Sequence, residues 1–275
     1  MPVPASTPAA AWLGAAFFVL LALAVYGVQV HRIRRDGGQV RVGEFDLPEL
    51  FMSFVFAGFF ALTVLLSVQR HKHEPAVKID AVLPNSLLFI LFTIGIAGFI
   101  RYRGVHLRPL FGLDRLSSLQ IAGWSCGLLL AAFPLAFAAN ALTLLASPGK
   151  LDPQPLVDLF ARVVQNHDVP AMTKILLSAV LIQPACEEFL FRGFFYGVWK
   201  RYLGPVSAGF LACLLFAGFH GSLSAFAGLF ALAVCLNIAY ERTGSLLVPI
   251  GMHALFNFTS LLVIYTQVQN LPASP

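Results

Sequence analysis

The sequence predicts an all-α protein, a polytopic transmembrane helix bundle of about eight spans. Of its 275 residues, 58% are hydrophobic and only 11% are charged, whereas soluble domains carry about 25% charged residues. Apolar runs close to the ~20 residues that cross a bilayer recur along the chain. Because backbone polar groups in lipid must be satisfied internally, these runs are expected to be helices.

The first half of the chain contains four of the predicted spans. The first run, residues 10–30, is followed by Arg32, Arg34 and Arg35. A secretory signal peptide has its positive charges before the apolar run, so a retained helix with its N-terminus outside is expected. The next runs are residues 50–69, 86–100 and 119–146, the last of which contains Pro134 and is expected to kink there.

The second half begins with a polar, proline-bearing segment, residues 147–169. Its Leu156, Phe160 and Val163 predict an amphipathic turn lying on the membrane interface. Four further apolar runs follow, and with them the chain has eight candidate spans, no internal repeat and no long linker. These runs are residues 171–199, 206–220, 223–240 and 246–265.

Basic residues on alternate loops predict the orientation of the bundle. With the N-terminus outside, eleven lysines and arginines fall on the cytoplasmic side and six on the outer side, which favours N-out and C-out. The same loops explain the net charge of +5, so no nucleic-acid partner is expected. The short, loop-poor chain is typical of a multi-pass protein of a bacterial cytoplasmic membrane. The inner set is Arg32, Arg34, Arg35, Arg41, Arg101, Arg103, Arg108, Arg115, Lys200, Arg201 and Arg242, and the outer set is Arg70, Lys72, Lys78, Lys150, Arg162 and Lys174.

The four cysteines fall within apolar runs and form no CxxC pair. Buried free thiols that behave as small hydrophobic side chains are therefore expected, and nothing near Cys186 favours a nucleophilic thiolate. The cysteines are Cys126, Cys186, Cys213 and Cys235.

Charged residues interrupt the fifth span. A buried charge in lipid costs about 3 kcal/mol or more, so Glu187, Glu188 and Arg192 indicate a functional site. Glu188 and Arg192 are one helical turn apart and are expected to pair. Glu187 points about 100° away and is expected to face a cavity, and Pro184 is expected to bend the helix just before it.

Two later spans carry further polar residues. Glu187 and His220 are each roughly sixteen residues from the turn at Gly204, which places them at one depth in an antiparallel pair. His253 and Asn257 are one turn apart on the last span. By residue counting, however, His253 lies at roughly 14 Å and Glu187 at roughly 25 Å from the inner surface, a discrepancy that protrusion of the fifth helix into the cytosol would reduce.

These side chains predict a polar catalytic cavity between the last four helices that hydrolyses its substrate with an activated water. Glu187 is the expected general base, with His220 assisting. His253 and Asn257 are expected to donate hydrogen bonds to a developing oxyanion. Taken singly, such residues are often interhelical hydrogen-bond partners, and two other classes stay open: a non-catalytic membrane partner, and a proton-coupled transporter that uses Glu187 and Glu188.

The motifs resemble those of the CPBP (CAAX protease and bacteriocin-processing, or Abi) intramembrane proteases, which are related to the type II CAAX prenyl endopeptidases. The resemblance covers roughly residues 170–263 and rests on three motifs in order. The EExxxR motif is matched by Glu187, Glu188 and Arg192, the FxxxH motif by Phe216 and His220, and the HxxxN/D motif by His253 and Asn257.

This resemblance implies an endopeptidase that acts within the membrane, in which Glu188, Arg192 and Phe216 support the catalytic groups. It divides the chain into N-terminal transmembrane helices with the interfacial segment (residues 1–169) and a catalytic core (residues 170–275). The expected partners are membrane lipid and a membrane-associated protein or lipidated peptide, with prenylated CAAX proteins as one candidate and bacteriocin immunity as an alternative role. No cofactor is expected; the alternative is a divalent metal such as zinc, held by Glu187, His220 and His253.

Overall fold

The computed structural model describes residues 9–70, 78–146 and 154–270, and within these ranges every regular element is helical. The predicted all-α architecture is confirmed. The elements are α1 (Ala9–Asp36), α2 (Leu47–Arg70), η1 (Ile79–Ala81), α3 (Val82–Tyr102), α4 (Leu107–Leu110), α5 (Ser118–Ala146), α6 (Pro155–Gln165), α7 (Val169–Leu176), η2 (Leu177–Ile182), α8 (Gln183–Glu188), η3 (Phe189–Tyr196), α9 (Gly197–Phe219), α10 (Leu223–Thr243) and α11 (Leu247–Gln269).

Seven helical stretches in the described ranges are long and apolar enough to cross a membrane, rather than the eight expected. The difference lies in the stretch Val169–Phe219, which contains both the fifth and the sixth predicted spans as one 51-residue unit. This unit is not straight, because Gly204 has a non-helical backbone (φ 77°, ψ 167°) and Pro205 follows it. Beyond this break α9 packs back along η3, and the Phe191 and Phe216 rings lie 5.2 Å apart.

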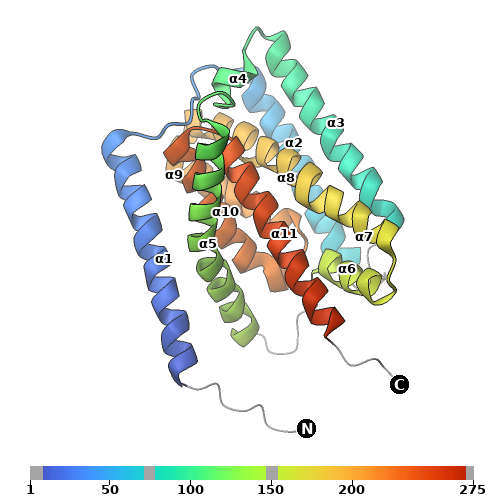
Figure 1. Ribbon diagram of the computed structural model, residues 1–275. Coiled ribbons are helices and arrows are strands. Elements are labelled where there is room, and N and C mark those ends of the chain that lie inside the picture. The colour runs from blue at the N-terminus through green and yellow to red at the C-terminus, as the bar shows by residue number, and fades with distance from the viewer. Residues whose placement is uncertain (1–8, 71–77, 147–153, 271–275) are drawn as a thin grey trace.

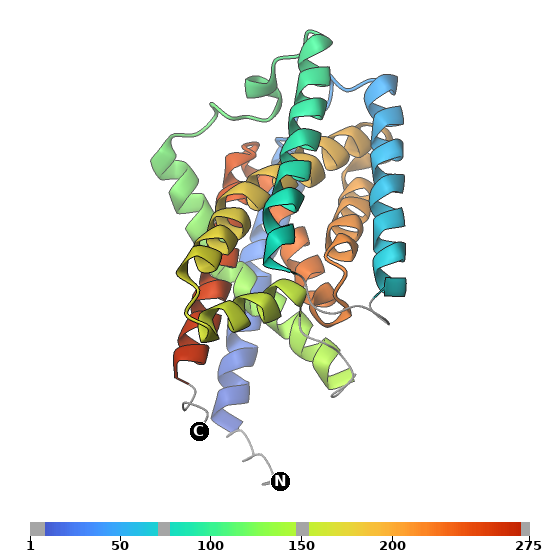
Figure 2. The ribbon, with the colours of Figure 1, turned by 90° about the vertical axis from the view of Figure 1, so that its right-hand side faces the viewer.

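One rod made of α7, η2, α8 and η3 runs obliquely through the middle of the bundle, as both views show (Figure 1, Figure 2). It contacts α3 on one side, and its η2 and α8 segments contact α11 on the other. Helix α10 packs against α5, α9 and α11, while α1 covers α5 and α10 from outside and α2 packs on α9. The oblique rod is therefore surrounded by the helices that carry the other predicted site residues.

An aromatic cluster fills the core between the rod, α2 and α3. Its members include Phe60, Phe89, Phe191, Phe195 and Phe216, each with 1% or less of its surface exposed. Edge-on and tilted ring pairs connect them, with Phe60 and Phe219 at 4.9 Å, and such pairs add about 0.5–1.5 kcal/mol beyond area burial. This cluster fixes the rod against the flanking helices.

The two ends of the bundle are built differently. At the end where α1 finishes, residues 37–46 cross the bundle, and we refer to them as the crossing segment. Gln39 N donates to Glu241 O at 2.9 Å, and Lys200 Nζ donates to Val40 O at 3.1 Å. At the other end lie α6, the start of α1 and the end of α11 (Figure 1).

Three further expectations concern the amphipathic turn, the kink at Pro134 and the burial of the cysteines. The predicted amphipathic turn is the eleven-residue α6, whose Phe160 and Val163 are buried in a cluster with α7 and α11 residues. The expected kink at Pro134 is not a break, because α5 continues through it. All four cysteines are free, but Cys126 is exposed on α5 rather than buried, since an apolar run in a membrane helix includes a lipid-facing side.

Candidate active site

The two adjacent glutamates sit on α8, a short α-helical segment between two π-helical ones, η2 and η3. A π-turn contains an extra residue and is frequent at functional sites, because it redirects the side chains that follow. Pro184 lies in the first turn of α8, where a missing N–H is tolerated. π-helical geometry thus flanks α8 on both sides of Pro184.

Glu188 is the fully buried centre of an ion-pair network. Its Oε1 accepts from Arg192 Nη1 at 3.0 Å, as the i,i+4 spacing predicted, and from His253 Nδ1 at 2.8 Å. Arg192 also donates to Ala233 O at 3.3 Å, and its guanidinium lies 4.2 Å above the Phe216 ring. These contacts compensate both buried charges and join η3, α9, α10 and α11.

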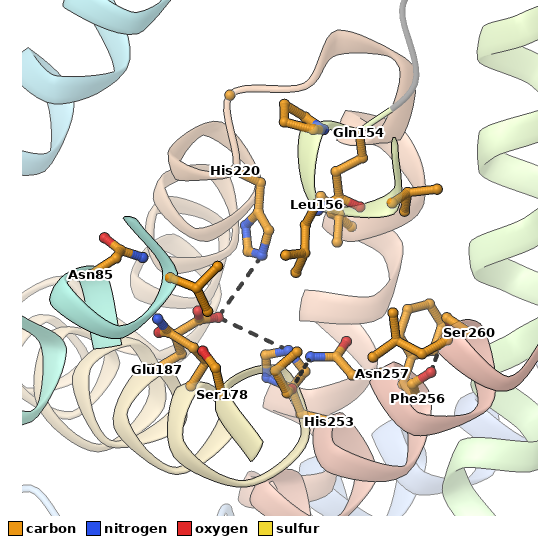
Figure 3. A pocket seen from close by; sticks show the side chains of 18 of the residues that line it. Asn85, Gln154, Leu156, Ser178, Glu187, His220, His253, Phe256, Asn257 and Ser260 are labelled. Carbon is orange, nitrogen blue, oxygen red and sulfur yellow. Dashed lines mark hydrogen bonds and ion pairs between the residues drawn. The ribbon is translucent and has the colours of Figure 1, made fainter. Parts of the chain in front are cut away.

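Glu187 faces the opposite way, toward a cavity. Its Oε2 lies 3.9 Å from His220 Nε2 and 4.0 Å from His253 Nε2, and it has no hydrogen-bond partner among the described residues. Figure 3 shows the two rings approaching this carboxylate from different helices. The structure thus brings His253 to Glu187 and His220, although residue counting placed His253 at a different depth.

The tilt of the rod explains that discrepancy. Counting at 1.5 Å per residue assumes a helix along the membrane normal, whereas the rod from α7 to η3 runs obliquely (Figure 2). A tilted helix gains less depth per residue, so Glu187 meets His253 although the count separates them.

The hydrogen bonds of the rings define which nitrogen faces the cavity. His220 Nδ1 lies 2.8 Å from Phe216 O, and a carbonyl only accepts, so Nδ1 carries the hydrogen and Nε2 of the neutral ring is an acceptor. His253 Nδ1 likewise donates to the Glu188 carboxylate. Both Nε2 atoms are thereby aimed at Glu187.

The remaining predicted residues lie beside these groups. Asn257 Nδ2 donates to Ala179 O of η2 at 2.8 Å, which fixes the amide at the cavity wall. An amide nitrogen carries two hydrogens, so a second N–H is available on the cavity side. Phe216 is fully buried, and its ring lies 4.7 Å from the His220 ring and 5.6 Å from the His253 ring.

The cavity itself has a volume of about 580 Å³ and a mostly apolar wall. Sequence reasoning did not identify five of its polar residues, among them Gln183 and Asn85. Gln183 is one turn before Glu187, so the i,i+4 spacing could have indicated it; Asn85 is on α3, and no spacing in the sequence relates it to the site. The wall also includes the start of α6, at Pro155 and Leu156 (Figure 3).

A metal would have to be held by Glu187, His220 and His253. In the described part of the chain no three histidine, cysteine, aspartate or glutamate side chains are grouped closely enough to hold a metal ion. His253 Nδ1 donates to Glu188 and leaves Nε2 free, an arrangement that metal-ligating histidines also use, so this bond does not distinguish the two mechanisms.

Together, the apolar helices and the buried carboxylate–imidazole cluster define an integral, multi-pass membrane protein with a cavity lined by this cluster. Residues 170–259, which include every motif residue of this cluster, match the family described as "Type II CAAX prenyl endopeptidase Rce1-like". That part of the chain is thus similar to this peptidase family, in agreement with the resemblance to the CPBP proteases.

Other comparisons add little about function. An Escherichia coli protein described as "Uncharacterized 24.3 kDa protein" is 30% identical over 110 residues, which cover 38% of this chain and 51% of that protein. The chain thus spans about half the length of this curated relative. No solved structure matches the chain.

Proposed function

We propose that this protein is an intramembrane endopeptidase that hydrolyses peptide bonds with a water activated by Glu187, without a metal. The observation that carries the proposal is the position of Glu187 Oε2, unpartnered at the cavity wall, 3.9 Å and 4.0 Å from the two imidazoles. The match of residues 170–259 to a peptidase family supports the same reaction class.

The spacing of the acceptors suits one water molecule. A water oxygen about 2.8 Å from each of two acceptors bridges nearly 4 Å at an angle of about 90°, close to the separation of Glu187 Oε2 and His220 Nε2. In the proposed reaction the water oxygen bonds to the scissile carbonyl carbon and its proton passes to Glu187. Glu187 then delivers that proton to the amine as the C–N bond breaks.

His253 and Asn257 are proposed to stabilise the oxyanion. When His253 is doubly protonated, Nδ1–H stays with Glu188 and Nε2–H faces the cavity. The second N–H of Asn257 is the other donor. Glu188 and Arg192 hold His253 in place from behind, and Phe216 packs between Arg192 and the two imidazoles, so these three residues position the catalytic groups.

The proposed substrates are membrane-associated proteins or lipidated peptides. The apolar wall of the cavity favours a hydrophobic segment or lipid next to the scissile bond, and prenylated CAAX-type substrates are one candidate. Within this proposal residues 170–275 form the catalytic core and residues 1–169 a lipid-contacting scaffold. The protein is proposed to lie in a bacterial cytoplasmic membrane with both termini outside.

The test is cleavage of labelled lipidated and plain peptides by the purified protein in detergent. Glu187→Gln and His220→Ala should each lower turnover by about 10²-fold or more while the protein stays folded. Glu44→Gln and His31→Ala, at exposed positions, are the matched controls and should cleave normally. Full turnover in both site variants would remove the assignment, and no cleavage by the wild-type protein would favour the non-catalytic alternatives.

Metal dependence is tested in the same assay. Turnover should be unchanged after treatment with a strong chelator, because the proposed base is Glu187 itself. A loss of turnover that zinc restores would instead support metal binding by Glu187, His220 and His253.

A further inference from the structure

We infer that a groove between α1, α5 and α10 binds one anionic phospholipid, with an acyl chain along the groove and the phosphate on Arg34 and Arg242. Among the described residues, none lines both this groove and the cavity at Glu187. The inference is therefore independent of the proposed peptidase activity. We call this site the α1 groove; its wall includes Leu23, Gly27, Val30, Leu135, Ala231 and Ile238.

The α1 groove is apolar and borders the outside of the bundle. It has a volume of about 560 Å³, and Leu23 in its wall is 54% exposed. Tyr26 and Cys235 also line it and are buried, and the Tyr26 hydroxyl is occupied because it donates to Leu128 O at 2.9 Å. A wall of this kind favours a hydrocarbon ligand, and the hydrocarbon that surrounds a membrane helix is lipid.

Two arginines lie at one end of the groove, one on each of its two longest walls. On α1 the wall residue Val30 is followed by Arg34, and on α10 the wall residue Ile238 is followed by Arg242. Each arginine is four residues beyond a wall residue, so it lies on the same helix face one turn further along. Both walls therefore lead from apolar side chains to a guanidinium group.

The ends of α1 and α10 that carry these arginines lie side by side. Directly after α1, Gln39 N donates to Glu241 O at 2.9 Å. Asp36, the last residue of α1, also interacts electrostatically with Arg242. The two long arginine side chains thus extend from neighbouring helix ends, where one phosphate group is able to contact both.

Neither arginine is neutralised by a bonded carboxylate. Arg34 and Arg242 form no ion pair within the described part of the chain, and Asp36 bonds Arg35 instead, at 2.7 Å. Glu241, which precedes Arg242 in the sequence, is paired with a lysine of α9. The end of the groove therefore carries positive charge that an anionic headgroup would compensate.

Arg242 is also held in a position that suits phosphate binding. Its guanidinium lies 5.7 Å from the centre of the Trp124 ring on α5, within the range of a cation–π contact. Its Nε is buried and has no hydrogen-bond partner among the described residues. Arginine binds phosphate through paired N–H donors, so a phosphate oxygen supplies the acceptor that the protein does not.

The distance along α1 matches the depth of one lipid leaflet. From Leu23 to Arg34 the helix advances eleven residues, which is about 16 Å along its axis. The hydrocarbon core of a bilayer is about 30 Å thick, so the acyl chains of one leaflet span about 15 Å. A phosphate at Arg34 therefore places an acyl chain beside Val30, Gly27 and Leu23. Because α1 packs mainly on α5 and α10, a lipid that bridges α1 and α10 holds α1 on the bundle.

Native mass spectrometry of the purified full-length protein tests the headgroup. The delipidated protein in detergent is titrated with phosphatidylglycerol or with phosphatidylcholine that has the same acyl chains. One phosphatidylglycerol should be retained, and it should raise the melting temperature more than phosphatidylcholine does. Arg34→Gln and Arg242→Gln should each weaken phosphatidylglycerol binding about fivefold, and together about 30-fold. Arg108→Gln is the matched control, because Arg108 is an exposed arginine on α4 away from the groove, and it should bind as the wild-type protein does.

A second variant tests the groove itself. Nothing lies within 4 Å of a Cβ added at Gly27, so the side chain of Gly27→Leu should fill the groove and abolish retention of the lipid while the protein stays folded. Gly14→Leu is its control, since Gly14 is on the same helix, outside the groove, with nothing within 4 Å of an added Cβ. Equal binding of the two lipids, or an equal loss in Arg108→Gln, would overturn the arginine site. Full retention in Gly27→Leu would show that the lipid does not occupy this groove and would overturn the inference.

Discussion

The adjacent carboxylates Glu187 and Glu188 have the same chemistry but opposite surroundings. Glu188 accepts from Arg192 and His253, so its charge is compensated by the protein. Oε2 of each glutamate has no hydrogen-bond partner in the described structure, but Glu187 lacks the Arg192 contact and lines the cavity, where water or substrate reaches it. Glu188 therefore stabilises the fold, whereas Glu187 is placed to react with a substrate.

This difference predicts opposite effects on stability. Glu188→Gln should lower thermal stability in detergent by about 3 kcal/mol or more, because it leaves the buried Arg192 charge uncompensated. Glu187→Gln should leave stability unchanged or raise it, since it removes an unpartnered buried charge. Thermal unfolding of the two variants beside the wild-type protein checks this; equal melting temperatures for the two variants would contradict the assigned roles.

Asn257 gives a second prediction at the residue scale. Asn257→Ala should lower kcat by about 10²–10³-fold with little change in KM, because an oxyanion donor acts mainly in the transition state. Thr259→Ala, on the same helix and with its hydroxyl bonded to Leu255 O, is the control and should cleave normally. A rise in KM with unchanged kcat would make Asn257 a substrate-binding residue instead.

Single-helix spacing predicted some of these contacts and not others. The Glu188–Arg192 pair follows from a four-residue separation, and it is present at 3.0 Å. The Glu188–His253 bond at 2.8 Å joins positions 65 residues apart and depends on the tilt of the rod. Spacing rules carry no information about tilt, so the sequence indicated His253 as a site residue without indicating its partner.

At the scale of elements, the break at Gly204 sets how α9 returns along the rod. Its φ of 77° and ψ of 167° lie in a region that is essentially restricted to glycine. This turn brings Phe216 and His220 back beside Phe191 and Glu187. The geometry of the site therefore depends on one backbone conformation about sixteen residues away.

Gly204→Ala should accordingly destabilise the protein by about 1–3 kcal/mol and reduce the specific activity of the folded fraction. Gly98→Ala is the matched control, because Gly98 is helical with nothing within 4 Å of an added Cβ; it should be neutral or stabilising by up to about 1 kcal/mol. Thermal unfolding with a cleavage assay provides both readouts, and equal behaviour of the two variants would show that the turn tolerates other residues.

Long apolar helices were the most predictable elements, because composition and length alone specify them. The division of residues 169–219 was less predictable, since a glycine–proline break interrupts a stretch that is otherwise helical throughout. The π-helical segments η2 and η3 had no sequence signal beyond Pro184.

At the scale of the whole molecule, the two ends of the helix bundle differ in structure. The start of α6 lines the cavity, and the opposite end is held by charge pairs and the crossing segment. Glu241 is central there: it is 5% exposed, and its Oε1 accepts from Tyr196 Oη and Lys200 Nζ, both at 2.5 Å. Gly38 packs directly against this carboxylate.

Replacing Gly38 should therefore loosen this end and spare the site. In Gly38→Ala the new Cβ would overlap the Glu241 carboxylate and lie 3.3 Å from Lys200 Nζ. Glu241 is fixed by two short bonds, so the crossing segment must shift, at a cost of about 1–3 kcal/mol. Limited proteolysis should cut residues 37–46 faster in this variant, with peptide cleavage nearly unchanged because no residue of the crossing segment lines the cavity.

Gly43→Ala is the matched control, since nothing lies within 4 Å of its added Cβ, and its proteolysis should follow that of the wild-type protein. Equal proteolysis of both variants would mean that the crossing segment is not held by its contact with Glu241. A large loss of peptide cleavage in Gly38→Ala, with the fold intact, would mean that this end of the bundle is coupled to the cavity.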